Sequence, residues 1–185
     1  MKILAVSDSH HDTSFLLPAL RRFAGEVDLI AHMGDGVADV KAAARQARMK
    51  LPRVEGVRGN GDHDPELWPR RLVGNSVRPI LLLHGHLDGV SEGLVKAMAK
   101  AEDSGAKVLL FGHTHRAFVQ VQRGILVLNP GSISRPRGRD RPTFAVIDVP
   151  EDLAVWFTVQ FYEVGPEAGP GTGPSSGRIK EIEVV

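Results

Sequence analysis

The sequence predicts an α/β fold in which two mixed β-sheets pack face to face as a sandwich, with helices flanking them. Short apolar runs alternate with amphipathic stretches in the N-terminal part, and the later part is rich in strand patterns. The chain has 185 residues, of which 42% are hydrophobic and 24% are charged, the balance of a globular protein. At this length folding buries roughly 70% of the surface of the unfolded chain, so a core can form without disulfides or a structural metal.

Strand and helix patterns alternate at the start of the chain. Residues 2–7 form a short apolar run that ends in polar residues, which predicts a strand buried on both faces. Residues 13–24 carry apolar side chains at near-helical spacing and predict a helix. Because proline is tolerated only in the first turn of a helix, Pro18 leaves the exact start of this helix open. A second strand is expected at residues 27–32, and an alanine-rich helix at residues 37–49. This order is typical of βαβ units.

Strand patterns dominate the chain after Arg53. One helix is expected at residues 90–102, with Ser91 as its N-cap. The expected strands cover residues 54–57, 71–77, 79–83, 108–111, 118–122, 125–128, 143–149 and 154–162. Strands so numerous, with few helices between them, favour mixed sheets that pack against each other.

The composition changes at Gly165. Residues 165–177 are dominated by glycine, proline and serine, which bury too little apolar surface to fold. We therefore expect one domain over residues 1–164 and a flexible segment over residues 165–177. Residues 178–185 alternate apolar and charged side chains, which leaves open an edge strand or a loose tail.

The composition also excludes several classes of site. The chain has no cysteine, so any metal must be bound by oxygen and imidazole rather than by thiolate. The formal net charge of +1 gives no bulk attraction to nucleic acid or to an anionic membrane, so neither is indicated as a partner. The N-terminal apolar run is too short for a signal peptide, and no run approaches the roughly 20 residues of a membrane span. The cytoplasm is the expected location.

Polar side chains follow five of the expected strands, at the point where each strand ends. They lie in the segments Asp8-Ser9-His10, His32-Met33-Gly34-Asp35, Gly59-Asn60-Gly61-Asp62, His84-Gly85-His86 and Gly112-His113-Thr114-His115. Because strand ends aim short loops into one crevice in α/β folds, we expect these carboxylate, imidazole and amide groups to meet. Each segment alone is a weak motif, but all of them in this order are specific. Oxygen and nitrogen donors of this kind favour manganese, iron, nickel or zinc.

In this order, the segments resemble the five metal-binding blocks of the calcineurin-like metallophosphoesterases, in particular the small single-domain bacterial and archaeal phosphodiesterases. The resemblance covers Met1 to about Val164. The sequence NPGS at residues 129–132, followed by Pro136 and Arg137, is a further block typical of that branch. The resemblance implies a four-layer αββα sandwich, in agreement with the strand and helix patterns.

The resemblance also implies a dinuclear centre of divalent transition metal ions. It assigns one metal to Asp8, His10, Asp35 and His115, and the second to Asp35, Asn60, His84 and His113, with Asp35 bridging the two. Manganese is the first expectation, while nickel, iron and zinc remain open. The implied reaction is hydrolysis of a phosphodiester by a metal-bridging hydroxide.

The residue at the position that supplies the acid for the leaving alcohol in the larger phosphatases of the superfamily differs in this chain. The larger serine/threonine phosphatases have a histidine after the metal-binding asparagine, where this chain has Gly61. Three histidines could replace it, namely His11, His63 and His86. We predict His86 as the acid, because the short turn places it beside His84. Asp62 is the second candidate catalytic residue, as an orienting group for a ligand or a water, with a turn carboxylate as the alternative.

Asn60 and Arg137 are the expected substrate contacts, and a phosphate-ester small molecule is the expected partner. Arg137 matches the family pattern, whereas the neighbouring arginines are interpreted as a solvated loop. Asp39 is expected to interact with the N-terminus of the second helix. The alternatives are a phosphomonoesterase or nuclease of the same superfamily, or a non-catalytic interaction scaffold of the same fold. A homo-oligomer remains open.

Overall fold

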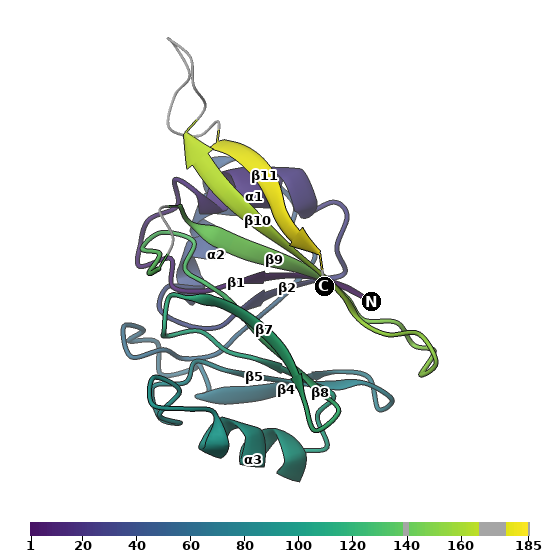
Figure 1. Cartoon of the computed structure of the whole chain (residues 1–185). Coiled ribbons are helices and arrows are strands. Elements are labelled where there is room, and N and C mark those ends of the chain that lie inside the picture. Colours follow the sequence, from purple (N-terminus) through teal and green to yellow (C-terminus); the bar gives the residue numbers. More distant parts are fainter. Residues whose placement is uncertain (139–140, 167–176, 185) are drawn as a thin grey trace.

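The computed structural model describes residues 1–138, 141–166 and 177–184, which form two stacked β-sheets with helices outside them (Figure 1). Sheet A has the strand order β11-β10-β9-β1-β2-β3, and sheet B has the order β4-β5-β6-β8-β7. The strands of sheet A are β1 (Lys2–Val6), β2 (Leu29–His32), β3 (Arg53–Gly56), β9 (Thr143–Asp148), β10 (Thr158–Pro166) and β11 (Gly177–Val184). The strands of sheet B are β4 (Arg70–Gly74), β5 (Pro79–Leu83), β6 (Val108–Leu110), β7 (Ala117–Gln122) and β8 (Ile125–Pro130).

Both sheets are mixed, as the sequence predicts. In sheet A, β1, β2 and β3 are parallel, whereas β9, β10 and β11 pair antiparallel with their neighbours. In sheet B, β5, β6 and β8 are parallel, and β4 and β7 add antiparallel edges. The parallel strands of each sheet therefore end at one edge, where their connecting loops can converge.

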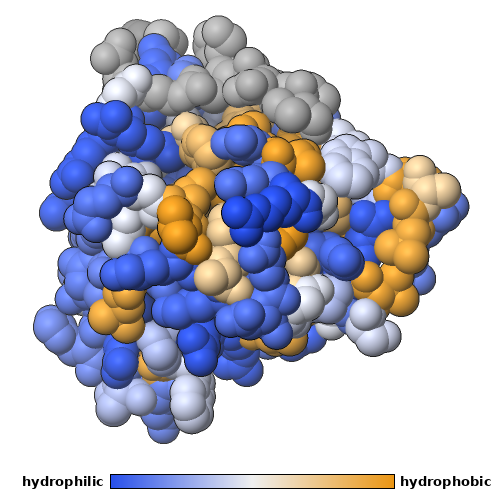
Figure 2. All heavy atoms as spheres, turned by 60° about the horizontal axis from the view of Figure 1, so that its bottom comes forward, coloured by the Kyte–Doolittle hydropathy of each residue, from blue (hydrophilic) through white to orange (hydrophobic). Residues whose placement is uncertain are grey.

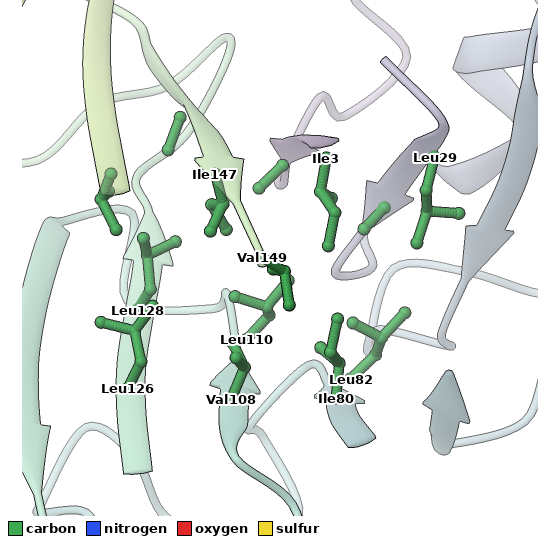
Figure 3. Packing of buried hydrophobic residues seen from close by; sticks show 14 of the residues in the cluster. Ile3, Leu29, Ile80, Leu82, Val108, Leu110, Leu126, Leu128, Ile147 and Val149 are labelled. Carbon is green, nitrogen blue, oxygen red and sulfur yellow. The ribbon is translucent and has the colours of Figure 1, made fainter. Parts of the chain in front are cut away.

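Apolar side chains lie on both faces of each sheet and fill the three interfaces between four layers, which are helices, sheet A, sheet B and a further helix. Ile3 of β1 and Leu82 of β5 face each other's sheets and join the core between them (Figure 3). The next residue in β1, Leu4, points to the outer face of sheet A, where α1 (Leu16–Phe23) and α2 (Val37–Gln46) cover it. On the outer face of sheet B, Leu83 packs with α3 (Val95–Asp103). The αββα expectation is confirmed.

The starts of two elements, α3 and β10, differ by four residues or more from the sequence prediction. α3 starts at Val95 rather than at residue 90, and its N-cap is Leu94 with no capping side chain, so the expected capping role of Ser91 is wrong. The reason is the backbone of the preceding glycines, since Gly89 and Gly93 have φ values of 63° and 153° that a helix cannot contain. β10 starts at Thr158, because the Asp152 side chain accepts a hydrogen bond from the backbone N–H of Ala154 (2.9 Å) and closes a turn there.

The C-terminal strands pair with each other beside β9. β10 extends to Pro166, so Gly165 and Pro166 belong to this strand, although the sequence places them in the flexible segment. β11 runs antiparallel to β10 at the edge of sheet A. The remainder of the expected flexible segment, residues 167–176, lies outside the described residues. Over the ranges that the structure describes, every helix is too short or too polar to cross a lipid bilayer.

An apolar protrusion interrupts the mainly hydrophilic surface. It lies at the right of Figure 2, on the side where Figure 1 places the connection between β9 and β10. Within this connection Leu153, Val155 and Trp156 are all more exposed than buried, at 66%, 51% and 53%. These side chains therefore lie outside the core of the described chain.

Candidate metal centre

The loops that leave the parallel strands of the two sheets meet at one edge of the sandwich. Sheet A supplies Asp8 and His10 after β1, Asp35 after β2 and Asn60 after β3, while sheet B supplies His84 after β5 and His113 and His115 after β6. Hydrogen bonds tie the two sets together. The backbone N–H of His113 donates to Asp8 Oδ2 (3.1 Å), and His84 Nδ1 donates to the carbonyl oxygen of Met33 (2.6 Å). The structure thus brings the predicted residues to one place.

Most of these turns hold a non-glycine residue in a left-handed backbone conformation. The φ values are 54° for Asp8, 48° for His10, 56° for Asp35, 67° for His113 and 60° for His115. Such conformations cost about 1 kcal/mol or more each for residues with a Cβ, and they cluster at functional sites because surrounding structure must enforce them. The chain therefore stores strain at the residues that the sequence singles out.

One group of donors consists of Asp8, His10 and His115, whose donor atoms lie close enough together to hold a cation. Asp8 Oδ1 is buried without a hydrogen-bond partner and lies 3.3 Å from His115 Nε2. His115 Nδ1 donates to the carbonyl oxygen of Arg135 (2.7 Å), which directs Nε2 toward His10 Nε2 at 3.1 Å. The facing Asp8 carboxylate raises the pKa of His115. An orphaned carboxylate oxygen that faces two imidazole nitrogens is a fitting environment for a cation.

A second group is formed around His84. Because His84 Nδ1 donates to a backbone carbonyl, a neutral ring carries a lone pair on Nε2. This atom lies 3.2 Å from Asn60 Oδ1 and 3.5 Å from Asp35 Oδ2. Lone pairs that face one another repel unless a cation or a proton lies between them. The donor set fits a divalent transition metal, since it combines imidazole nitrogen with carboxylate and amide oxygen.

Asp35 lies between the two groups. Its Oδ1 accepts a hydrogen bond from the backbone N–H of Gly61 (2.6 Å), which leaves Oδ2 facing the cleft. Asp35 Oδ2 is 3.5 Å from His84 Nε2 and 3.9 Å from His10 Nε2. Asp8 is also shared, because it belongs both to the group with His10 and His115 and to a group with Asp35 and His84. The family resemblance, by contrast, implies that Asp8 binds one metal alone.

His113 faces the same cleft from β6. Its ring centroid lies 5.1 Å from that of His84, and burial lowers its pKa, which favours the neutral, metal-binding form of the imidazole. The cleft has a volume of about 430 Å³. It is lined by His10, Asp35, Asn60, His113, His115, Arg135, Pro136 and Arg137. Cationic side chains thus border the donors, as an anionic ligand requires.

A family model described as the calcineurin-like phosphoesterase superfamily domain matches residues 1–152. The chain belongs to this superfamily. It is 37% identical over 163 residues to the probable metallophosphoesterase YsnB of Bacillus subtilis, which covers 88% of this chain and 91% of YsnB. It is 28% identical over 169 residues to the phosphodiesterase YfcE of Escherichia coli K12, covering 80% of this chain and 88% of YfcE.

A solved structure agrees with this assignment. A conserved protein of Streptococcus pneumoniae TIGR4, described as a predicted phosphoesterase, superposes with a TM-score of 0.75 at 27% identity, covering 98% of this chain and 97% of that one. The resemblance seen in the sequence is therefore confirmed, and the chain is a metal-dependent phosphoesterase by family.

The two candidate catalytic residues of this phosphoesterase occupy different surroundings. Asp62 accepts backbone hydrogen bonds from Asp35 (2.8 Å), Gly36 (2.8 Å) and Gly59 (2.9 Å). Burial opposes ionisation of Asp62, but these bonds hold its pKa below the ordinary value. Its carboxylate thus joins the turns after β2 and β3.

His86 lies beside two candidate ligands instead. Its ring centroid is 5.2 Å from that of His84 and 6.3 Å from that of His113. Its Nδ1 is buried without a hydrogen-bond partner, and burial lowers its pKa. His86 is therefore placed as a neutral imidazole at the margin of the donors.

A buried polar network below the phosphoesterase's donors was missed in the sequence. Ser9 Oγ contacts His32 Nε2 (3.1 Å) and donates to Asp39 Oδ2 (2.6 Å). Asp39 also accepts the backbone N–H of His11 (2.9 Å), so its carboxylate, although it lies in the first turn of α2, bonds to the turn after β1. Burial lowers the pKa of His32 to about 4. The position of Ser9 between the predicted ligands Asp8 and His10 is the one feature of the sequence that points to this network.

The NPGS block and the nearby Ser134 support the turns after β1 and β6. Ser132 Oγ donates to the backbone carbonyl of Asp8 (2.8 Å), and Ser134 Oγ does the same (2.9 Å). Asn129 Nδ2 donates to the carbonyl of Gly112 (2.8 Å) and to Thr114 Oγ1 (3.1 Å). These bonds fix the strained turns after β1 and β6, which explains why polar residues lie in a buried strand end.

Proposed function

We propose that this protein hydrolyses phosphodiesters with two divalent transition metal ions, in the first place manganese. The observation that carries the proposal is the position of Asp35, whose Oδ2 faces His10 on one side and His84 on the other. A carboxylate oxygen between two sets of imidazole and oxygen donors is the arrangement that a metal pair needs.

The donors divide the work of holding these metals. One set comprises Asp8, His10, Asp35 and His115, and the other comprises Asp35, Asn60, His84 and His113. When bound, the metals supply Lewis acidity for the phosphate oxygens and lower the pKa of a water. Backbone carbonyls hold His84 and His115 with Nε2 toward the cleft, so little rearrangement is needed on binding.

Substrate recognition falls to the polar rim of the cleft. Arg137 is exposed there, next to the donors, and its planar guanidinium suits a bidentate contact with a phosphate. Asn60 is exposed beside it, and its neutral amide adds no negative charge that would repel the substrate. These two residues would orient the phosphate ester.

His86 is the proposed proton donor to the leaving alcohol. It is the histidine nearest to His84 that is not a proposed ligand, and its Nδ1 has no partner in the protein. Because burial lowers its pKa, His86 is mainly neutral near pH 7 and a weak acid catalyst. Leaving groups that need little protonation, such as phenols, should therefore react fastest.

One relative, the phosphodiesterase YfcE, supports diester specificity. Metal analysis and an assay of bis(4-nitrophenyl) phosphate test the proposal. The protein is freed of metal, loaded with manganese, nickel or zinc, and its metal content measured. We expect about two metal ions per chain and hydrolysis that depends on them. A His113→Ala variant should lose activity and metal, whereas Gln120→Ala on β7, outside the cleft, serves as the control.

Three results would contradict the proposal. A metal-to-protein ratio that saturates near one would refute the dinuclear centre. A fully metal-loaded protein that hydrolyses 4-nitrophenyl phosphate but not the diester would favour a phosphomonoesterase. Inactivity on every phosphate ester would leave the non-catalytic alternative.

A further inference from the structure

A second cavity adjoins the metal cleft. Its volume is about 520 Å³, within the range of small-molecule sites. Arg137 lines both cavities. Thr114 lines the second cavity, while its neighbours His113 and His115 line the metal cleft. A molecule whose phosphate lies at the donors can therefore extend into the second cavity.

The floor of this cavity is apolar and partly aromatic. Phe111 and Phe118 meet edge to face, with ring centroids 6.2 Å apart and an interplanar angle of 61°. Val90 and Leu94 also line the cavity, from the segment that leads into α3. Phe111 and Val90 are buried and belong to the core cluster behind sheet B. Because the core holds these walls, the cavity is formed in advance of any ligand.

The rim of the cavity is polar and cationic. Arg116 and Arg137 line it together with the hydroxyl-bearing Ser91 and Thr114. A guanidinium group is planar and weakly hydrated, and it stacks on aromatic faces. An apolar floor with guanidinium groups at its mouth suits a flat ring attached to an anion better than a flexible alkyl chain.

We propose that this cavity binds a planar aromatic group of the phosphodiester while the phosphate occupies the metal cleft. This inference rests on the proposed function, because it requires a phosphate ester at the donors. It adds a substrate class, aryl or heteroaryl phosphodiesters, and assigns specificity to residues that lie outside the metal-binding blocks. Phe111 and Phe118 contact the ring edge, and Arg137 contacts both the ring and the phosphate.

Binding of unreactive phosphonates to the manganese-loaded protein tests this without turnover. Calorimetric titration compares phenylphosphonate, methylphosphonate and n-hexylphosphonate. Burial of one ring should make the dissociation constant of phenylphosphonate about tenfold lower than that of methylphosphonate, since part of the apolar gain is lost to ordering. The hexyl compound should bind more weakly than the phenyl compound.

A pair of variants assigns the preference to the cavity. Ser91→Phe adds a ring at the rim and should remove the phenyl preference while methylphosphonate binds as before. Glu92→Phe adds the same ring to the neighbouring exposed position, which does not line the cavity, and should keep the preference. Leu94→Ser, which replaces an apolar side chain of the cavity wall, should weaken binding of phenylphosphonate but not of methylphosphonate.

The outcomes separate this inference from the proposed function. An active diesterase that binds phenyl- and methylphosphonate equally would overturn the aromatic subsite and leave the function intact. Equal binding of hexyl- and phenylphosphonate would overturn the aromatic preference. A phenyl preference that Ser91→Phe removes, in a protein that hydrolyses no ester, would support the subsite and refute the proposed function.

Discussion

Replacement of His32 should remove a large part of the pH dependence of stability. His32 is fully buried at the end of β2, and burial lowers its pKa from 6.5 to about 4. In the unfolded chain the ring takes up a proton near pH 6.5, whereas the folded protein keeps it neutral. The unfolded state thus binds more protons between these values. The neutral ring's contribution to the free energy of unfolding is therefore complete above pH 6.5, the pKa in the unfolded chain. It is lost as the pH falls toward about 4, the pKa in the folded protein.

The magnitude follows from the two pKa values. One pKa unit corresponds to about 1.4 kcal/mol, so the full effect of a fall from 6.5 to about 4 is about 3 kcal/mol. Between about pH 7.5 and about pH 5, about 2 kcal/mol of unfolding free energy should be lost through this one ring. That is a large share of the stability of an ordinary domain.

Urea unfolding in the presence of a chelator measures the effect. The free energy of unfolding is compared at the two pH values for the native chain and for His32→Gln, which cannot titrate. Other histidines with lowered pKa, such as His86, remain in both proteins and cancel in the difference. The variant should lose about 2 kcal/mol less than the native chain on acidification. An identical loss in both proteins would refute the reasoning, whatever the variant's stability at neutral pH.

Three further predictions concern the metal centre. In Gly59→Ala the new Cβ would lie 2.1 Å from Asp35 Oδ1, so metal content and activity should fall at least about tenfold. The control Gly25→Ala, whose new Cβ meets no atom within 4 Å, should keep both. Metal analysis measures the effect, and a fully metal-loaded Gly59→Ala would contradict the reasoning. Ser9→Ala leaves buried polar groups without a partner and should lower the free energy of unfolding by about 1–3 kcal/mol in urea titrations at neutral pH, while unchanged stability would exclude a structural role of the network. Because a buried carboxylate raises the pKa of His115, protons compete with metal there. Manganese affinity measured by calorimetry should therefore weaken as the pH falls through the neutral range, and a pH-independent affinity would argue against His115 as a ligand.

The strand ends could be predicted from the sequence because two signals coincide at each of them. An apolar run marks a parallel strand, and the polar residue after it must lie at the common edge. Asp8 and His84 follow this rule directly. The family blocks then supplied the division between two metals, which spacing alone does not contain.

Other features could not be predicted because they depend on residues far apart in the chain. Ser9 meets Asp39 across 30 positions, and neither residue has a periodic pattern around it. The late start of α3 depends on the positive φ of Gly93, which follows from the path of the loop rather than from helix propensity. The left-handed conformations of the donor turns are likewise imposed by hydrogen bonds such as that from Ser132 to Asp8.

The donors come from both sheets, and this has a mechanical consequence. Apolar burial between sheets A and B is non-directional, so only the close packing of side chains opposes a small displacement of one layer relative to the other. A cation held by Asp35 of one layer and His84 of the other would oppose this displacement through directional bonds, which apolar side chains do not form. The proposed metal ions would then also hold the two sheets in a fixed relative position. Their removal would lower the resistance of the sandwich to displacement of one sheet against the other.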